Sequence, residues 1–277
     1  MPHPVFNAAV KGCLEGFTEF LPISSTGHLI LVRHMFPLTA SRDPAELARI
    51  DNLFDIVIQF PAVLAIVVLY RERLWKMARG VGERPEARRF WGGLLLAFLP
   101  AAALGFLCHD LVEGVLMKPL PVAVALILGG AVLIGVDRLA GAGRIGRAEE
   151  TPLGRAFGVG VCQCLALVPG VSRSGATIVG GRFLGLAREA AAEYSFFLAL
   201  PTMGGAFAFK LAKELGNIHW ASDGPVLLVG SLASFATAWA VVALFIRFLQ
   251  KHSLAFFGWY RLALGALVLA LGRVWAG

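Results

Sequence analysis

The sequence has little charge for its length. Of its 277 residues, 16% are charged and 57% are hydrophobic, and the mean hydropathy is +0.73. A soluble domain has about 25% charged and about 45–50% apolar residues. The composition therefore indicates an integral membrane protein. The net charge of +7 forms no basic patch interleaved with exposed aromatic residues, which argues against a nucleic-acid partner.

Two further features are missing. Residues 1–9 lack the basic segment followed by an apolar core that marks a signal peptide. The four cysteines, Cys13, Cys108, Cys162 and Cys164, are scattered in apolar sequence. Cys162 and Cys164 have the spacing of metal ligands, but no second pair supports them, so we favour packing as small hydrophobic side chains.

Long apolar runs are abundant. A membrane-spanning helix needs ~20 mostly apolar residues. Several runs contain no Asp, Glu, Lys or Arg, and two more qualify if Asp55 and Gln59 are tolerated in one and Arg261 in the other. Asp55 and Arg261 are equally suited to structural pairing and to lining a site. Six spans are predicted, near residues 53–71, 90–109, 119–137, 192–212, 225–247 and 254–273.

The basic residues predict how these spans are oriented. Residues 71–89 hold seven Lys or Arg and residues 138–155 hold four, whereas residues 110–118 hold one base and two acids. Cytoplasmic loops carry an excess of Lys and Arg. The first two segments should therefore be cytoplasmic and the third outside. Residues 247–252, with two more bases, fall on the cytoplasmic side only if residues 156–185 enter the membrane and return.

The content of that returning segment agrees with a re-entrant turn. "VPGVSRSG" (Val168–Gly175) has a proline, two glycines, two serines and an arginine within an apolar run. Irregular backbone is tolerated at membrane depth only where it is buried in protein or lines a cavity.

An earlier stretch, "EGFTEFLPISSTGHL" (Glu15–Leu29), resembles the returning segment. Further on, "FDIVIQFP" and "YSFFLALP" each have an aromatic residue seven positions before a proline. Chance similarity between two apolar segments is the alternative to an internal repeat. Aligning Gly12 with Gly160 pairs Glu15 with Gln163, Ser24 with Ser172, Thr26 with Ser174, and Gly27 with Gly175.

The repeat predicts an all-α polytopic membrane protein with inverted topology. Residues 1–277 form a single membrane domain with halves 1–140 and 150–277. Each half has a re-entrant helical hairpin, about 5–35 and about 154–186, followed by three spans. The first hairpin enters from outside and the second from inside, so their tips meet near the midplane and both termini lie outside.

The first tip gathers acids, hydroxyls and a histidine. Glu15 and Glu19 are four residues apart, so they share one helix face. Two carboxylates so close repel each other, which favours a proton or a cation between them. Pro22 ends the helix and His28 follows the polar turn. The alternatives are an exposed helix end for the acids and simple packing for His28.

The second tip is suited to an anion. It contains Ser172, Arg173, Ser174 and Gly175. A glycine-containing turn that opens a helix presents backbone N–H groups, and an arginine adds a fork for phosphate oxygens. The alternative for Arg173 is a side chain that extends to the membrane surface. Together the two tips fit either phosphoryl transfer or gated anion transport.

"EGFTEFLPISSTGH" (Glu15–His28) and "PGVSRSGATI" (Pro169–Ile178) resemble the two signatures of the bacterial undecaprenyl pyrophosphate phosphatases. The resemblance covers nearly the whole chain, with departures outside the motifs, such as Pro61. It implies a membrane hydrolase that removes the terminal phosphate from undecaprenyl pyrophosphate. This reaction recycles the lipid carrier for peptidoglycan synthesis and is tied to bacitracin resistance.

The resemblance also implies roles for residues at both tips. Glu15 and Glu19 would bind a divalent cation, Mg²⁺ or Ca²⁺, or act as acid and base. Ser25 would be the nucleophile or a phosphate-binding hydroxyl, His28 an acid or base, and Arg173 the clamp on the pyrophosphate. Whether Ser25 or a water attacks stays open. The remaining implied substrate-binding residues are Thr26, Gly27, Ser172, Ser174 and Gly175.

The resemblance places the protein in the bacterial inner membrane, with the site and both termini facing the periplasm. The partners implied are the polyprenyl pyrophosphate and membrane lipid, and a homodimer is compatible with them. Two alternatives to an enzyme stay open. One is a flippase that moves the lipid phosphate through the same inverted repeat, and the other is a non-catalytic lipid-binding or scaffold protein.

Overall fold

The computed structural model describes residues 3–33, 35–41, 43–108 and 119–275, and all structural statements refer to these residues. Within them every regular element is a helix, and one isolated bridge joins Ile145 and Leu186. Five helices are long and apolar enough to cross a membrane, and α12 (Ala255–Trp275) is apolar over residues 255–270. The chain is an all-α polytopic membrane protein. The five are α3 (Pro44–Leu69), α5 (Pro85–Leu107), α7 (Pro119–Ala140), α10 (Arg188–Glu214) and α11 (Trp220–Leu249).

The long helices overlap all six predicted spans but begin up to nine residues earlier. Helix α3 begins at Pro44 rather than near residue 53. Proline is favoured at the first helical position, and the side chain of Asp43 accepts a hydrogen bond from the backbone N–H of Ala45 at 3.0 Å. A prediction from the hydrophobic run alone begins the helix too late, because the run does not include this capped, polar first turn.

Two pairs of short helices form the predicted hairpins. The first pair is α1 (Pro4–Thr18) and α2 (Ser25–Val32), and the second is α8 (Leu153–Gln163), extended by η3 (Cys164–Leu167), and α9 (Arg173–Phe183). At 1.5 Å per residue these helices are about 12–22 Å long. The hydrocarbon core of a bilayer is about 30 Å thick, so none of them spans it alone.

The two hairpins have the same local geometry at their tips. Ser24 and Ser172 have φ values of 72° and 74°, and they are the only non-glycine residues with positive φ in the part of the chain described. Each serine caps the following helix, because its Oγ accepts from the backbone N–H of Gly27 or Gly175. The sequence alignment paired these same residues with each other. Such strained backbone persists only where the surrounding structure holds it.

Each hairpin packs against the other half of the chain. Helix α1 lies along α11, where Gly12 contacts the backbone of Gly230 so closely that a Cβ would overlap the Gly230 carbonyl. Helix α8 lies along α5, where Gly160 makes the corresponding approach to Ala97. Because each hairpin contacts the second long helix of the opposite half, the halves interlock.

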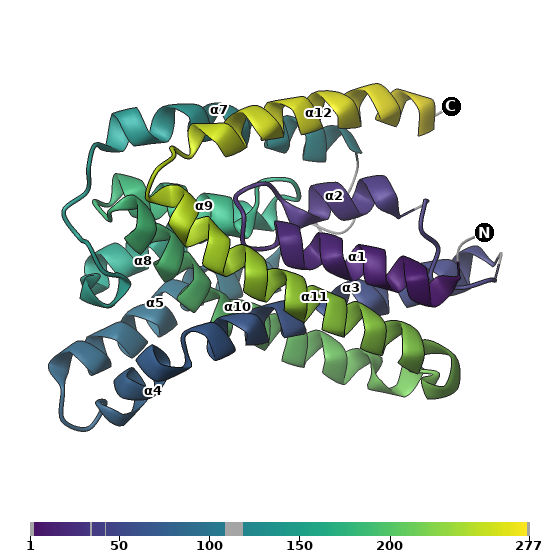
Figure 1. Ribbon diagram of the computed structural model, residues 1–277, viewed down its shortest axis with the longest axis horizontal. Coiled ribbons are helices and arrows are strands. Elements are labelled where there is room, and N and C mark those ends of the chain that lie inside the picture. The colour runs from purple at the N-terminus through teal and green to yellow at the C-terminus, as the bar shows by residue number, and fades with distance from the viewer. Residues whose placement is uncertain (1–2, 34, 42, 109–118, 276–277) are drawn as a thin grey trace.

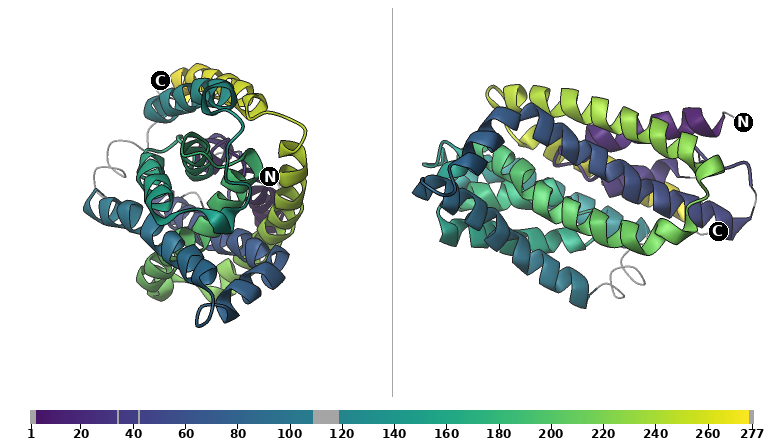
Figure 2. Two further views of the ribbon diagram at one scale, coloured as in Figure 1. Left: turned by 90° about the vertical axis from the view of Figure 1, so that its left-hand side faces the viewer. Right: turned by 90° about the horizontal axis from the view of Figure 1, so that it is seen from below.

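Loops with many basic residues gather at one end of the molecule, which we call the basic end. It consists of α4 (Arg71–Arg79), the segment 140–153 with η2 (Ala148–Glu150), and residues 249–255. The beginning of α1 and the end of α12 lie at the opposite end (Figures 1 and 2). The three segments that the sequence predicts to be cytoplasmic are therefore on one side of the helix bundle.

Ion pairs hold the basic end together. Arg73 of α4 contacts Glu149 at 2.5 Å and Glu193 of α10 at 2.7 Å. Burial alone would raise the pKa of Glu149, but hydrogen bonds from Arg73 and the backbone, together with the charges of Arg73 and Arg147, hold that pKa below its usual value. The pair is therefore charged at neutral pH and links α4 to the spanning helices.

Candidate active site

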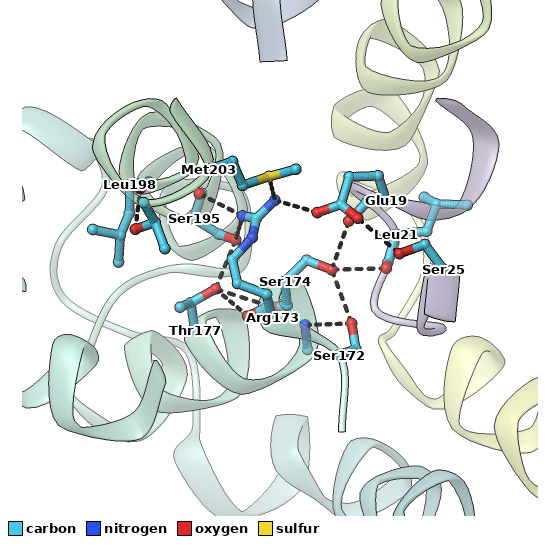
Figure 3. A network of polar contacts seen from close by, with 12 residues as sticks. Glu19, Leu21, Ser25, Ser172, Arg173, Ser174, Thr177, Ser195, Leu198 and Met203 are labelled. Carbon is cyan, nitrogen blue, oxygen red and sulfur yellow. Dashed lines mark hydrogen bonds and ion pairs between the residues drawn. The ribbon is translucent and has the colours of Figure 1, made fainter. Parts of the chain in front are cut away.

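The tips of the two hairpins meet in the interior of the bundle. The hydroxyl of Ser174, which is completely buried, donates to the carbonyl oxygen of Leu21 at 2.8 Å and lies 3.2 Å from the carbonyl oxygen of Glu19 (Figure 3). Its oxygen also lies 3.0 Å from Oγ of Ser172. Residues about 150 positions apart in the sequence are thereby joined by direct hydrogen bonds.

Arg173 is fixed between these tips. Its Nη1 donates to the carbonyl oxygen of Ser195 at 2.9 Å, and its Nη2 lies 3.0 Å from Oε1 of Glu19 (Figure 3). The guanidinium also lies 5.6 Å from the ring centre of Phe20. Thr177 donates to the hydroxyl of Ser195 at 2.7 Å and so fixes Ser195, the residue whose carbonyl oxygen accepts from Arg173. The arginine predicted to bind phosphate is held in place rather than extended toward a membrane surface.

Glu19 joins the arginine to a hydroxyl. While Oε1 faces Arg173, Oε2 accepts a hydrogen bond from Ser25 at 2.8 Å. The side chain of Glu19 is 9% exposed, so the carboxylate lies in a largely dry environment. A hydroxyl that donates to a carboxylate beside a guanidinium is suited to attack an anionic phosphorus centre, because the carboxylate can take the proton.

A pocket of about 170 Å³ opens at this point. Five of the predicted site residues line it, and they come from both hairpins. Three other polar or polarisable side chains, Ser24, Gln59 and Met203, line it as well. The five predicted residues are Glu19, Ser25, Thr26, Ser172 and Arg173.

Three predicted substrate-binding residues lie behind the pocket wall. The backbone N–H groups of Gly27 and Gly175 already donate to the capping serines, at 3.3 and 3.0 Å. The hydroxyl of Ser174 joins the two tips. In this arrangement these groups shape the tips, and their contact with a substrate stays a prediction.

Glu15 lies one helical turn before Glu19 and is completely buried. Neither of its carboxylate oxygens has a hydrogen-bond partner among the residues that the structure describes. A buried carboxylate without a partner is costly and favours a proton or a cation. Carboxylate oxygens are ligands that Mg²⁺ and Ca²⁺ prefer, so the residues fit the cation that the resemblance implies. No group of three His, Cys, Asp or Glu residues suited to an ion occurs in the described part of the chain, so further oxygens would have to come from a substrate or water.

His28 faces α12 and does not line the pocket. Its Nδ1 lies 2.7 Å from the carbonyl oxygen of Ser24, which requires a proton on Nδ1. Its Nε2 lies 2.7 Å from the hydroxyl of Tyr260 and so accepts from it. The rings of His28 and Tyr260 are stacked, with their centres 5.6 Å apart. The predicted role of His28 as an acid or base at the phosphate therefore stays a prediction.

Arg261, whose role the sequence left open, clamps both tips. The side chain is buried, and its five N–H groups all donate to backbone carbonyl oxygens, at 2.7–3.3 Å. Gly129 leaves room for the guanidinium. One side chain from α12 thus holds both hairpins to α7. The acceptors are Pro22, Gly170 and Val171 in the tips and Ala125 and Leu126 in α7.

Asp55, also left open by the sequence, belongs to a charge network outside the pocket. Its carboxylate lies 3.7 Å from Arg33, which also contacts Asp51 at 3.3 Å. Asp51 in turn pairs with the buried Lys11 at 2.7 Å. This network joins α1 to α3 and assigns Asp55 to structural pairing.

A larger groove of about 670 Å³ adjoins the pocket. Arg173 and Ala166 line both, so the groove begins where the pocket ends. Its walls are mainly apolar side chains of α5, α10 and η3, and no acidic residue contributes to them among the residues described. The aromatic residues of the walls are Phe98, Phe106 and Phe209.

Some residues that build the site could not be identified from the sequence. Ser195, in the run "YSFF", fixes Arg173 with its backbone carbonyl oxygen. The two residues are 22 positions apart, and a backbone acceptor cannot be recognised from the residue type. Gln59 was noted only as a polar residue that a span must tolerate. Tyr260 resembles any aromatic residue near a helix end, and only the three-dimensional arrangement places it against His28.

Fold and site together define a polytopic membrane protein whose interior pocket combines a guanidinium group, hydroxyl groups and a carboxylate. Comparison with known families agrees. The chain belongs to the family described as bacitracin resistance protein BacA, which it matches over residues 8–267.

The chain also resembles individual members of known function. It is 45% identical over 271 residues to an undecaprenyl-diphosphatase of Aromatoleum aromaticum, covering 98% of this chain and 96% of that protein. It is 48% identical over 274 residues to an undecaprenyl-diphosphatase of Sorangium cellulosum, covering 96% of this chain and 86% of that protein. The similarity therefore includes both hairpins and all the long helices.

Proposed function

We propose that the protein is an undecaprenyl-diphosphatase that hydrolyses undecaprenyl pyrophosphate to undecaprenyl phosphate and inorganic phosphate. The names of its relatives support this proposal. The observation that carries it is the joining of Ser25, Glu19 and Arg173 in one pocket, by contacts of 2.8 and 3.0 Å. These side chains supply a nucleophile or water-positioning hydroxyl, a proton acceptor and an anion clamp.

The pocket and the groove divide the substrate between them. The terminal phosphate fits the polar pocket, whose hydroxyl groups and guanidinium donate to anionic oxygens. The prenyl chain fits the apolar groove between α5 and α10. Arg173 lines both cavities, so it lies where the diphosphate would join the chain.

The reaction follows from these positions. Either a water attacks the terminal phosphorus directly, or Ser25 attacks first and a water then hydrolyses the phosphoserine to release inorganic phosphate. In both cases the proton that the nucleophile loses passes to Glu19. The bond from that phosphorus to the bridging oxygen breaks, and the lipid monophosphate leaves. Arg173 neutralises the charge on the transferred group. A divalent cation held by Glu15 and Glu19 would offset the charge of the phosphate oxygens.

Phosphate release from farnesyl diphosphate by the purified protein tests the proposal. We expect release with Mg²⁺ or Ca²⁺ and loss of activity in excess chelator, because the buried carboxylate of Glu15 has no hydrogen-bond partner in the described part of the chain. Geranyl alcohol and the empty detergent are the controls. Absence of release with either cation would contradict the proposed activity, and full release in chelator would contradict the cation.

Ser25→Ala tests the role of the hydroxyl. If Ser25 attacks or positions the water, its loss should lower kcat by about 100-fold or more. Ser253→Ala, an exposed serine at the basic end, is the matched control and should leave kcat unchanged. Wild-type activity in Ser25→Ala would exclude Ser25 as the nucleophile.

A second candidate function is transport of the lipid phosphate across the membrane. The two hairpins enter the bundle from opposite ends, and their matching tips reach the same interior point (Figure 1). This arrangement favours transport as the second candidate. Reconstituted vesicles containing a lipid phosphate on one side decide between the two. Movement no faster than in protein-free vesicles would remove this candidate.

We further propose that the protein lies in the bacterial inner membrane with its basic end in the cytoplasm. The gathering of the basic loops at one end supports this orientation. Both termini would then face the periplasm, and we propose that the site opens to the same side. Reporter fusions at either terminus should give a periplasmic signal. A cytoplasmic signal would contradict the proposed orientation.

A further inference from the structure

Gln163 is a buried amide at the inner end of the groove. The residue is 1% exposed, and its Nε2 has no hydrogen-bond partner. Its Oε1 lies 3.3 Å from the hydroxyl oxygen of Thr202, and that hydroxyl donates to the carbonyl of Leu198 at 2.8 Å. Whichever way the amide is turned, at least one of its N–H groups has no partner among the residues described. A buried donor without an acceptor is costly, so its presence in this position points to a ligand.

The internal repeat gives this position a counterpart. Alignment of the hairpins pairs Gln163 with Glu15. Both side chains are buried, and the Nε2 of Gln163 and both carboxylate oxygens of Glu15 lack hydrogen-bond partners among the residues described. Their chemistry differs in one respect. The carboxylate of Glu15 repels phosphate and attracts a cation, whereas the neutral amide of Gln163 can donate to a phosphate oxygen. The two equivalent positions are therefore suited to opposite charges.

The surroundings of Gln163 identify which phosphate it can reach. Gln163 lines the groove but not the pocket, and Arg173 lines both. A terminal phosphate in the pocket is surrounded by Ser25 and Ser172. The phosphate bonded to the prenyl chain must then lie at the junction, on the groove side of Arg173.

We propose that Gln163 binds the phosphate group that stays on the lipid, by donating an amide hydrogen to one of its oxygens. This inference rests on the proposed function, because it assumes that a prenyl diphosphate occupies the pocket and the groove. It adds a second phosphate subsite to the site between the tips. The ligand class is a prenyl phosphate monoester, which is also the product of the reaction.

Binding of farnesyl monophosphate to the purified full-length protein tests the inference without requiring turnover. Isothermal titration calorimetry in detergent micelles gives its Kd, with inorganic phosphate and farnesol as comparison ligands. Gln163→Met keeps the length of the side chain and removes the donor. We expect it to raise the Kd of farnesyl monophosphate about tenfold or more and to leave the affinities for inorganic phosphate and farnesol unchanged.

Two further variants make the result specific. Gln163→Glu places a carboxylate against the phosphate and should weaken binding more than Gln163→Met does. Gln250→Glu makes the same change at an exposed position of the basic end and should have no effect. Thermal unfolding of each variant reports whether the fold is kept. If Gln163→Met does not fold, Gln163→Asn, which shortens the amide by one methylene, takes its place.

The outcomes separate the inference from the proposed function. An unchanged Kd for farnesyl monophosphate in folded Gln163→Met overturns the inference. It is also overturned if this variant loses as much affinity for inorganic phosphate as for farnesyl monophosphate, because Gln163 would then only position Arg173. Failure of the wild-type protein to bind farnesyl monophosphate also overturns it. Wild-type binding without phosphate release would contradict the proposed hydrolysis and leave the subsite supported.

Discussion

Arg173→Lys is expected to lower kcat/KM for phosphate release by about 1000-fold. The guanidinium is a planar fork held by Ser195 and Glu19, and it lies where the charge of the transferred phosphate would develop. A lysine carries the same charge but is a single point of contact on a flexible stem. Its three N–H groups share one nitrogen, so it cannot bind two phosphate oxygens in the planar, bidentate geometry of the fork while the contact with Ser195 is kept.

The measurement is steady-state phosphate release from farnesyl diphosphate in matched micelles. Arg144→Lys is the control, because Arg144 is exposed at the basic end and should tolerate the change. Thermal unfolding of both variants shows whether a loss of activity reflects chemistry or stability. Activity of Arg173→Lys within about tenfold of wild type would contradict the role we assign to the fork.

Arg261→Met is expected to lower both stability and activity, although Arg261 does not line the pocket. Its five N–H groups bond to carbonyl oxygens of both tips and of α7. Removing them deprives the tip carbonyl groups of Pro22, Gly170 and Val171 of these bonds, at about 1–3 kcal/mol for each group that is left without a partner and that water cannot reach. The tips would also lose their relative position, and displacement of reacting groups by about 1 Å can cost about 100-fold in rate.

Thermal unfolding and phosphate release are measured together for this variant. Arg138→Met removes an exposed arginine near the end of α7 and should change neither. Arg261→Lys keeps the charge but supplies three donors, so it should recover only part of the stability. A variant Arg261→Met with wild-type stability and activity would show that the tips are held in another way.

The sequence predicts the architecture well, because the signals for it are local. Apolar length identifies the long helices, and the polar residues around Pro22 and Pro169 identify the interruptions. The alignment of Gly12 with Gly160 anticipated matching tips, and Ser24 and Ser172 have matching backbone geometry. Capped polar ends such as Pro44 extend the helices beyond their apolar runs.

The sequence predicts the site less completely, because the site depends on contacts between distant helices. The motifs supplied Glu19, Ser25 and Arg173, but the residues that fix them come from α10 and α12. The sequence made Arg261 equally suited to structural pairing and to lining the site, and the structure gives it a structural role without a charged partner among the residues described. It bonds to backbone carbonyl groups, whose positions no side-chain pattern reveals.

The central claim is that the two tips form one site, and a double-mutant cycle between Ser25→Ala and Arg173→Lys tests it most directly. Residues that act on the same transferred group are strongly non-additive. We predict that the double variant releases phosphate from farnesyl diphosphate at nearly the rate of the slower single variant. A rate equal to the product of the two separate losses would show that Ser25 and Arg173 act independently and would contradict the account.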